Sequence, residues 1–92
     1  MKDEYSEVVR KFYEIYRPLQ KKHNLKLHTH FDIYDDGRIE IWECEGETCV
    51  KHVCRVKEKE DIECYRKAIQ ELEHYRREKE KREDERSATM AG

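Results

Sequence analysis

Four cysteines are the side chains best suited to chemistry in this chain of 92 residues. Cys44, Cys49, Cys54 and Cys64 follow the spacing Cys-x4-Cys-x4-Cys-x9-Cys. Structural zinc sites favour cysteine pairs about two to four residues apart, so this spacing matches no common ligand signature. Because no secretory signal opens the chain, we expect the cysteines to be reduced thiols or metal ligands.

Two of these cysteines suggest a specific site. If the strands pair as argued below, His28, Cys44 and Cys49 lie in one row and could offer an imidazole and two thiolates to zinc. Cys44 and Cys49 could instead form a disulfide between neighbouring strands. We expect unmodified thiols and no cofactor, with the zinc site and the disulfide as alternatives. Cys54 and Cys64 are expected in the core, because buried cysteine usually packs as a small hydrophobic residue.

The apolar pattern predicts a helix near each end of the chain. Over 5–19 the apolar residues recur at three- and four-residue steps, which is the period of a half-buried helix. Pro18 is expected to distort the last turn or to end this helix at Arg17. A second apolar stripe over 62–75 follows Asp61, an acceptable N-cap residue.

Apolar and polar residues alternate over 25–34, 38–45 and 49–56, which predicts three strands with one buried face. Short turns between consecutive strands favour an antiparallel meander. The predicted fold class is therefore α+β, a two-layer α/β sandwich of order α-β-β-β-α. We expect both helices to cover one face of the sheet, the face that carries Ile39 and Ile41.

The chain is predicted to form a single domain over 1–86. Over 76–86 the charges alternate in sign without apolar residues, which is typical of a helix that extends into solvent. Residues 87–92 are expected to form a disordered tail. Apolar runs are too short to span a membrane, so we expect no membrane partner and a cytoplasmic location, including the cytoplasm of a host cell.

The turn residues predict a strand register. Asp35-Asp36-Gly37 resembles a three-residue hairpin loop, which sets Tyr34 opposite Arg38 and Ile33 opposite Ile39. A loop over 45–48 sets Cys44 opposite Cys49. His52 and Cys54 are then predicted to point inward. The predicted exposed rows are His28, Cys44 and Cys49; His30, Trp42 and Lys51; and Asp32, Glu40 and Val53.

The element order resembles that of double-stranded-RNA-binding domains. Members of that family carry a Gly-Pro-containing loop with a histidine between the first two strands, and a Lys-rich start to the final helix. Here the loop is Asp35-Asp36-Gly37, and the final helix opens with Glu58-Lys59-Glu60-Asp61-Ile62-Glu63. Both segments are acidic where that family binds phosphates, so the resemblance covers topology only.

Charged residues make up 46% of the chain and leave a formal net charge of -2. This balance argues against a nucleic-acid-binding domain, because most such domains carry a basic excess, and it argues against an acidic nucleic-acid mimic. Catalysis needs a nucleophile with a base, paired acids in a cleft or a metal with an open position. No such arrangement stands out, so we expect a protein that is not an enzyme.

The exposed face of the sheet is the predicted partner-binding surface. The core needs no large side chains there, and exposed aromatic residues rimmed by charges often concentrate binding energy. Ordinary packing between strands is the alternative reason for aromatic residues on this face. The candidate partner-binding residues are Trp42, His30, Tyr34, Val53, Lys51 and Glu40.

These observations predict a small protein-binding module, an inhibitor or adaptor that docks a protein partner or a nucleoprotein complex. Small charge-rich α/β domains are common among inhibitors encoded by phages and mobile elements, including anti-CRISPR proteins. A homodimer and a small zinc-binding protein are alternatives. A further alternative is nucleic-acid binding through the basic residues of 76–86 and of the first helix, namely Lys2, Arg10, Lys11, Arg17, Lys21 and Lys22.

Overall fold

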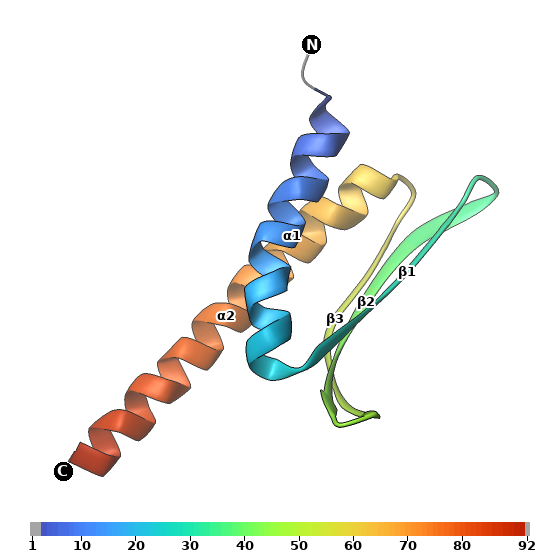
Figure 1. Ribbon diagram of the computed structural model, residues 1–92. Helices are drawn as coiled ribbons and strands as arrows, with labels where there is room; N and C mark the ends of the chain where they lie inside the picture. Colours follow the sequence, from blue (N-terminus) through green and yellow to red (C-terminus); the bar gives the residue numbers. More distant parts are fainter. Residues whose placement is uncertain (1–2, 92) are drawn as a thin grey trace.

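Two helices lie on one face of a three-stranded antiparallel sheet (Figure 1). This computed structural model describes the backbone of residues 3–91 and the side chains of residues 3–83. The elements are α1 (Glu4–His23), β1 (Leu25–Asp32), β2 (Asp35–Glu45), β3 (Thr48–Glu58) and α2 (Asp61–Ala91). The strand order β1-β2-β3 is a meander, so the predicted α-β-β-β-α fold is confirmed.

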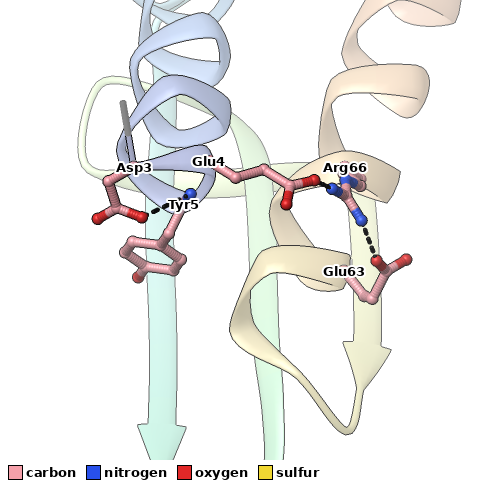
Figure 2. Close-up of polar contacts among 5 residues, drawn as sticks. All are labelled: Asp3, Glu4, Tyr5, Glu63 and Arg66. Atoms are coloured by element: carbon pink, nitrogen blue, oxygen red, sulfur yellow. Dashed lines mark hydrogen bonds and ion pairs between the residues drawn. The ribbon is translucent and has the colours of Figure 1, made fainter. Parts of the chain in front are cut away.

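The first turn of α1 is tied to the beginning of α2 (Figure 2). Asp3 caps α1, because its Oδ1 accepts a hydrogen bond of 3.1 Å from the backbone N–H of Tyr5. The next residue, Glu4, binds the guanidinium group of Arg66, which also binds Glu63 on its own helix. These groups are exposed, so they orient the helix ends more than they stabilise the fold.

The other end of α1 lies beyond its proline. Pro18 is inside the helix, which continues to His23, so the predicted end at Arg17 is wrong. Asn24 stops the helix in the left-handed conformation, with a φ of 53°, and its N–H donates to the carbonyl of Gln20. Proline removes its own backbone donor and its ring crowds the carbonyl four residues earlier, and packing of the helix on the core offsets this cost.

The core lies between the two helices and the inner face of the sheet, which is the face that they cover. Phe12 and Tyr16 of α1 stack with their ring centroids 5.6 Å apart. Tyr65 of α2 meets Phe12 edge-on at 5.3 Å. Ile39 and Ile41 of β2 are fully buried in the same cluster. The helices therefore cover the Ile39 and Ile41 side of the sheet, as predicted.

The turn between β1 and β2 lies earlier in the chain than predicted. Ile33 and Tyr34 form it. The Oδ1 of Asp32 accepts a hydrogen bond of 2.9 Å from the backbone N–H of Tyr34, which supports the turn without a glycine. The predicted pairing of Tyr34 with Arg38 is wrong, because Arg38 lies opposite His30.

Gly37 belongs to β2 rather than to a turn, and the predicted turn at Asp35-Asp36-Gly37 is wrong. A Cβ on Gly37 would lie 2.7 Å from Cδ1 of Phe31 and 3.1 Å from Sγ of Cys64. Close approach of the backbone to a packed side chain is a second reason for a glycine, besides a turn. The sequence pattern alone does not distinguish the two.

The β1–β2 register is offset from the predicted one by an even number of residues. Ile39 pairs with Thr29 rather than with Ile33, and Ile41 pairs with Leu27. Because side chains alternate between the faces of a strand, an even offset leaves every side chain on its predicted face. The faces of β1, and of β2 as far as Trp42, were therefore predicted correctly, although the paired residues were not. Cys44 was predicted in an exposed row but is buried, next to a bulge in the β2–β3 pairing.

The β2–β3 hairpin has the predicted pairing at its turn and two bulges beyond it. Cys44 lies opposite Cys49, which confirms the prediction. Gly46 has a φ of 61°, as the first central residue of a tight hairpin turn requires. The register then shifts twice, between Glu43 and Cys44 and between Ile41 and Trp42.

These bulges change the direction of several side chains in β3. His52 pairs with Trp42 and is exposed, so its predicted inward position opposite Ile41 is wrong. Val53 packs partly against the core, so its predicted place in an exposed row is wrong as well. Cys54 is buried beside Ile41, as expected of a core residue. Each bulge adds one residue to β3 and reverses the alternation beyond it, so the second bulge restores the alternation that the first one reversed.

The second half of α2 extends away from the sheet and from α1 (Figure 1). Tyr75 is its last buried residue among those with described side chains, and Lys22 of α1 binds Glu83 at 2.9 Å. The stretch 87–92, the predicted tail, falls in the last turns of α2 and in residue 92, which is outside the described residues. Within the described part of the chain, neither helix has the length and apolar composition needed to cross a membrane.

Candidate functional site

The candidate site is the outer face of the sheet, the surface opposite the two helices (Figure 1). In β2 the side chains of this face alternate with Ile39 and Ile41, which point into the core. Paired residues form three rows across the strands. The rows are Lys26, Trp42 and His52; His28, Glu40 and Arg55; and His30, Arg38 and Lys57.

Positive charge dominates the outer face. Its permanent cations are Lys26, Arg38, Arg55 and Lys57, and the three rows contain one carboxylate, Glu40. Glu40 is partly buried, and its Oε1 lies 3.5 Å from Nε of Arg55. Since the whole chain has a formal net charge of -2, charges of opposite sign are segregated on the surface of the protein.

Acidic side chains lie at both ends of the outer face, in its two hairpins. The oxygen Oδ2 of Asp35 lies 3.6 Å from a guanidinium nitrogen of Arg38, where the basic rows meet the first hairpin. An anionic partner would be attracted to the middle of the face and repelled at its ends. The acidic residues are Asp32, Asp35 and Asp36 near the β1–β2 turn, and Glu45 and Glu47 near the β2–β3 turn.

Two aromatic rings lie together in one row of the outer face. The ring centroids of Trp42 and His52 are 4.1 Å apart, and the ring planes are tilted by 37°. Trp42 is partly buried and His52 is exposed. Lys26 completes the row on the other side of Trp42. The pair offers a flat aromatic surface beside a cation, which suits a planar or anionic ligand group.

Two open hollows follow the basic rows. His28, His30, Arg38 and Glu40 line a hollow of about 200 Å³ between β1 and β2. A second hollow of about 170 Å³ lies between β2 and β3 and shares Arg38 and Glu40 with the first. Since both are open and lined mainly by polar and charged side chains, they suit contact with an extended chain better than enclosure of a small apolar ligand.

Three of the predicted partner-binding residues lie together on the outer face. Trp42, His30 and Glu40 occupy adjacent rows. Tyr34 does not belong to this group, because it lies in the β1–β2 turn with 91% of its surface exposed. Ile33 beside it is 88% exposed, so the tip of this hairpin is apolar.

The other two predicted partner-binding residues lie at the seam between β3 and α2. Lys51 pairs with Glu43 rather than with Trp42. Together with Val53 it lines a hollow of about 190 Å³, whose other side is formed by α2 residues including His74. The two bulges in the hairpin move both residues out of the predicted rows.

The predicted zinc ligands are not brought into one row. His28 lies opposite Glu40, whereas Cys44 and Cys49 pair next to the β2–β3 turn. Among the described residues, no group of three or more His, Cys, Asp or Glu side chains is arranged to hold a metal ion. The predicted row of ligands is wrong because it depended on the loop at Asp35-Asp36-Gly37. A disulfide between Cys44 and Cys49 stays a prediction, and the described thiols are free.

The buried thiols are held in their protonated form. Burial raises the pKa of the Cys54 thiol to about 12. Burial also raises the pKa of Cys44, with a further contribution from its hydrogen bond to the thiol of Cys49. The pKa of Cys64 is raised by burial as well. Because the thiolate is the reactive species, these environments disfavour nucleophilic attack by the three buried thiols.

A polar cluster that the sequence did not indicate joins the inner face to α2. The hydroxyl of Tyr75 donates a hydrogen bond of 2.7 Å to Oε2 of Glu43, and Nζ of Lys79 lies 3.3 Å from the same oxygen. The hydrogen bond from Tyr75 and the charge of Lys79 lower the pKa of Glu43. Burial lowers the pKa of His23, whose ring meets Tyr75 edge-on at 5.6 Å. This cluster anchors α2 to the sheet.

Five residues of the outer face were not among the predicted site residues. Lys26 and Arg38 lie on the face that the alternation in β1 and β2 does predict, so the signal for them was present. Arg55 lies beyond both bulges of β3, which together restore the predicted alternation, so the signal for it was present as well. Lys57 lies one residue past the predicted end of the strand, and His52 lies between the bulges, where the alternation is out of phase.

No protein-family model, curated protein or solved structure matches this chain. The outer face therefore has to be interpreted from its own chemistry.

Proposed function

We propose that this protein is a non-enzymatic binding module that docks a larger, anionic macromolecule on the outer face of its sheet. The observation that carries this proposal is the segregation of charge. Four cations and one already paired carboxylate occupy the three rows, in a chain whose formal net charge is -2. Such a concentration of one sign steers an oppositely charged partner to the surface.

The packing of the sheet supports the same proposal. The inner face is covered by α1 and α2 and forms the core. On the outer face, Lys26 and His52 are exposed and Trp42 is only partly buried. Residues there are under little constraint from the fold, so their charge is free to serve binding. The protonated thiols described above also favour binding over covalent catalysis.

The helices offer a less suitable surface for an anionic partner. On α1, Nε of Arg10 lies 3.9 Å from Oε1 of Glu14, and Lys22 binds Glu83 of α2. The outer face has ion pairs as well, Glu40 with Arg55 and Asp35 with Arg38, but its three rows hold four cations against one carboxylate. Along 76–86 basic and acidic residues alternate, so their charges largely cancel at the distance of a partner. Nucleic-acid binding through the first helix and 76–86 is for this reason the second choice. An inhibitor role of the anti-CRISPR type, a homodimer and a cytoplasmic location stay predictions.

The test is capture of native partners by the immobilised protein and by two variants with equal charge changes. In Lys26→Glu/Lys57→Glu the outer face loses two cations, and the ion pair of Glu40 with Arg55 is kept. In the control, Lys11→Glu/Lys81→Glu, two exposed helix lysines are replaced instead. Circular dichroism and thermal melting verify that both variants fold.

We expect the wild type and the helix variant to capture the same macromolecule, and the outer-face variant to lose it. Equal capture by both variants would contradict the proposal, because it would place the binding surface elsewhere. Loss in the helix variant alone would move the binding surface to the helices.

A further inference from the structure

We propose that the macromolecule bound on the outer face is a single-stranded nucleic acid. This inference rests on the proposed function and names the partner. The phosphates would contact the basic rows, and a base would stack on the ring pair of Trp42 and His52. Proteins that bind single strands commonly combine a positively charged groove with aromatic side chains on which bases stack. Both parts are present here on one open face.

The first step is electrostatic. Arg38, Arg55 and Lys57 line the second hollow, and Arg38 also lines the first, so these three cations form a continuous path over β2 and β3. Arg55 is 76% exposed even though it contacts Glu40, so its guanidinium group remains accessible to a phosphate. Arginine suits this role, because its planar fork binds phosphate oxygens in pairs.

The second step is stacking. The rings of Trp42 and His52 already lie 4.1 Å apart, and His52 is the exposed member of the pair. A base placed on His52 would extend this stack outward, and Lys26 lies in the same row to meet its phosphate. Trp42 is held by partial burial, so the aromatic surface is largely formed before binding and little freedom is lost.

The third step separates a single strand from a duplex. In a duplex the bases are stacked on one another, so an aromatic pair on a flat sheet cannot reach their faces. In the described part of the chain, both helices lie on the opposite face, so neither could enter the groove of a duplex bound here (Figure 1). The acidic ends of the outer face, which include Asp35, Asp36 and Glu47, would repel the second backbone of a wider ligand.

The fourth step separates nucleic acid from an acidic protein. The buried centres of protein interfaces are depleted in charged residues and rich in apolar ones. In the three rows of the outer face, Trp42 is the one large apolar side chain, and four cations and three histidines surround it. A protein partner would have to desolvate these groups without a hydrophobic centre in return, whereas phosphates bind them directly.

The experiment uses Trp42 as the reporter, because it is the single tryptophan of the chain. Fluorescence of Trp42 is measured while mixed-sequence single strands of RNA and DNA, about 12 nucleotides long, are added at about 50 mM salt and then at higher salt. A duplex of the same sequence and poly-glutamate are the competing ligands. The variants are His52→Ala, Lys26→Glu/Lys57→Glu and the helix variant Lys11→Glu/Lys81→Glu.

We expect single strands to quench Trp42 and to bind more tightly than the duplex or poly-glutamate. The His52→Ala variant should bind about 10-fold more weakly, as expected for loss of one stacked base. For Lys26→Glu/Lys57→Glu, the slope of the logarithm of the binding constant against the logarithm of the salt concentration should become less steep by about 1.4. This is roughly 0.7 for each phosphate that a lysine no longer neutralises. The helix variant should bind as the wild type does.

Three results would overturn the inference. Tighter binding of the duplex would show that stacking plays no part, and equal quenching by poly-glutamate would reduce recognition to charge alone. Absence of binding to either nucleic acid at low salt would exclude the partner. If the capture experiment still depended on Lys26 and Lys57 in that case, the binding face would stand and its partner would be an acidic protein.

Discussion

The two faces of this one sheet differ in almost every physical property, although the same three strands supply both. On the inner face, Ile39 and Ile41 are fully buried beneath the helices. On the outer face, Arg38, Glu40 and Trp42 alternate with them and meet solvent in whole or in part. The inner face is apolar and closely packed, and the outer face is basic and open.

This difference shows that the residues needed for stability are concentrated on one face of the sheet. A domain of about this size buries roughly 60% of the surface that its unfolded chain exposes, so its core leaves little to spare. The residues that cover the inner face are required for folding. The outer face is not, which is why a concentration of like charge there is better explained by a partner than by the fold.

The largest expected effect comes from a cavity on the inner face. Replacing Ile41 with alanine should lower the free energy of unfolding by about 2–5 kcal/mol, because a fully buried side chain leaves an unfilled space. The measurement is urea denaturation followed by circular dichroism. In a domain of this size each kcal/mol corresponds to roughly 4–8 °C in melting temperature, so thermal melting gives a second readout.

The matched control for Ile41→Ala is the outer-face variant Lys26→Glu/Lys57→Glu. Its free energy of unfolding should change by no more than about 0.5 kcal/mol, since both side chains are exposed and neither carries a described ion pair. A loss comparable to that of Ile41→Ala would break the comparison, because the outer face would then be part of what holds the fold together.

The sequence predicted the layers of this fold and the faces of two strands. Period-two alternation identified Ile39 and Ile41 as inner residues, and helical periodicity placed Phe12 and Tyr16 in the core. These signals depend on burial, which local patterns report well. The register failed because it depended on Gly37, whose role is set by the distant ring of Phe31 and not by its neighbours in sequence.

The residues of the proposed binding face were predicted only in part, for a related reason. Trp42, His30 and Glu40 follow from the alternation in β1 and β2. The rows that Arg55 and Lys57 join, and the outward position of His52, depend on two bulges that each add one residue to β3. No local signal marks such a bulge. The nearly balanced charge of the whole chain also concealed the segregation, because net charge carries no information about which charges share a face.

The next largest effect is expected where the backbone of Gly37 lies close to the ring of Phe31. Replacing Gly37 with alanine should lower the free energy of unfolding by about 1–3 kcal/mol, because the new methyl group overlaps the ring of Phe31. That ring is held at 5.6 Å from Tyr65, so it cannot move aside freely. Denaturation with urea measures the loss.

Phe31 provides the control for Gly37→Ala. In the background of Phe31→Leu, a smaller side chain leaves room for the methyl group, so the cost of Gly37→Ala should shrink and the two changes should not add. Additive losses would mean that the overlap with Phe31 is not the cause. In that case the cost would come from the other close contact of the new methyl group, Sγ of Cys64 at 3.1 Å.

The smallest effect concerns the polar exception on the inner face, where Tyr75 binds Glu43. Replacing Tyr75 with phenylalanine keeps the ring and removes the hydrogen bond of 2.7 Å. The free energy of unfolding at neutral pH should fall by about 1 kcal/mol, as expected for a hydrogen bond to a partly exposed carboxylate that keeps Lys79 as a partner. The matched variant Glu43→Gln should lose a similar amount.

The same variant sharpens the comparison through its dependence on pH. Because the folded protein lowers the pKa of Glu43 below the ordinary 4.5, the stabilisation is complete above that value and is lost as the pH falls through the lowered one. The lowered pKa of His23 adds a separate loss of stability that begins as the pH falls below 6.5.

The Tyr75→Phe variant keeps the aromatic edge against His23. The urea midpoints of the variant and the wild type should therefore fall in parallel until Glu43 begins to titrate. Below pH 4.5 the wild type should lose stability faster, since it alone loses the hydrogen bond from Tyr75. Parallel curves over the whole range would mean that the hydroxyl does not hold Glu43 in its ionised form, and the inner face would then be stabilised by apolar packing alone.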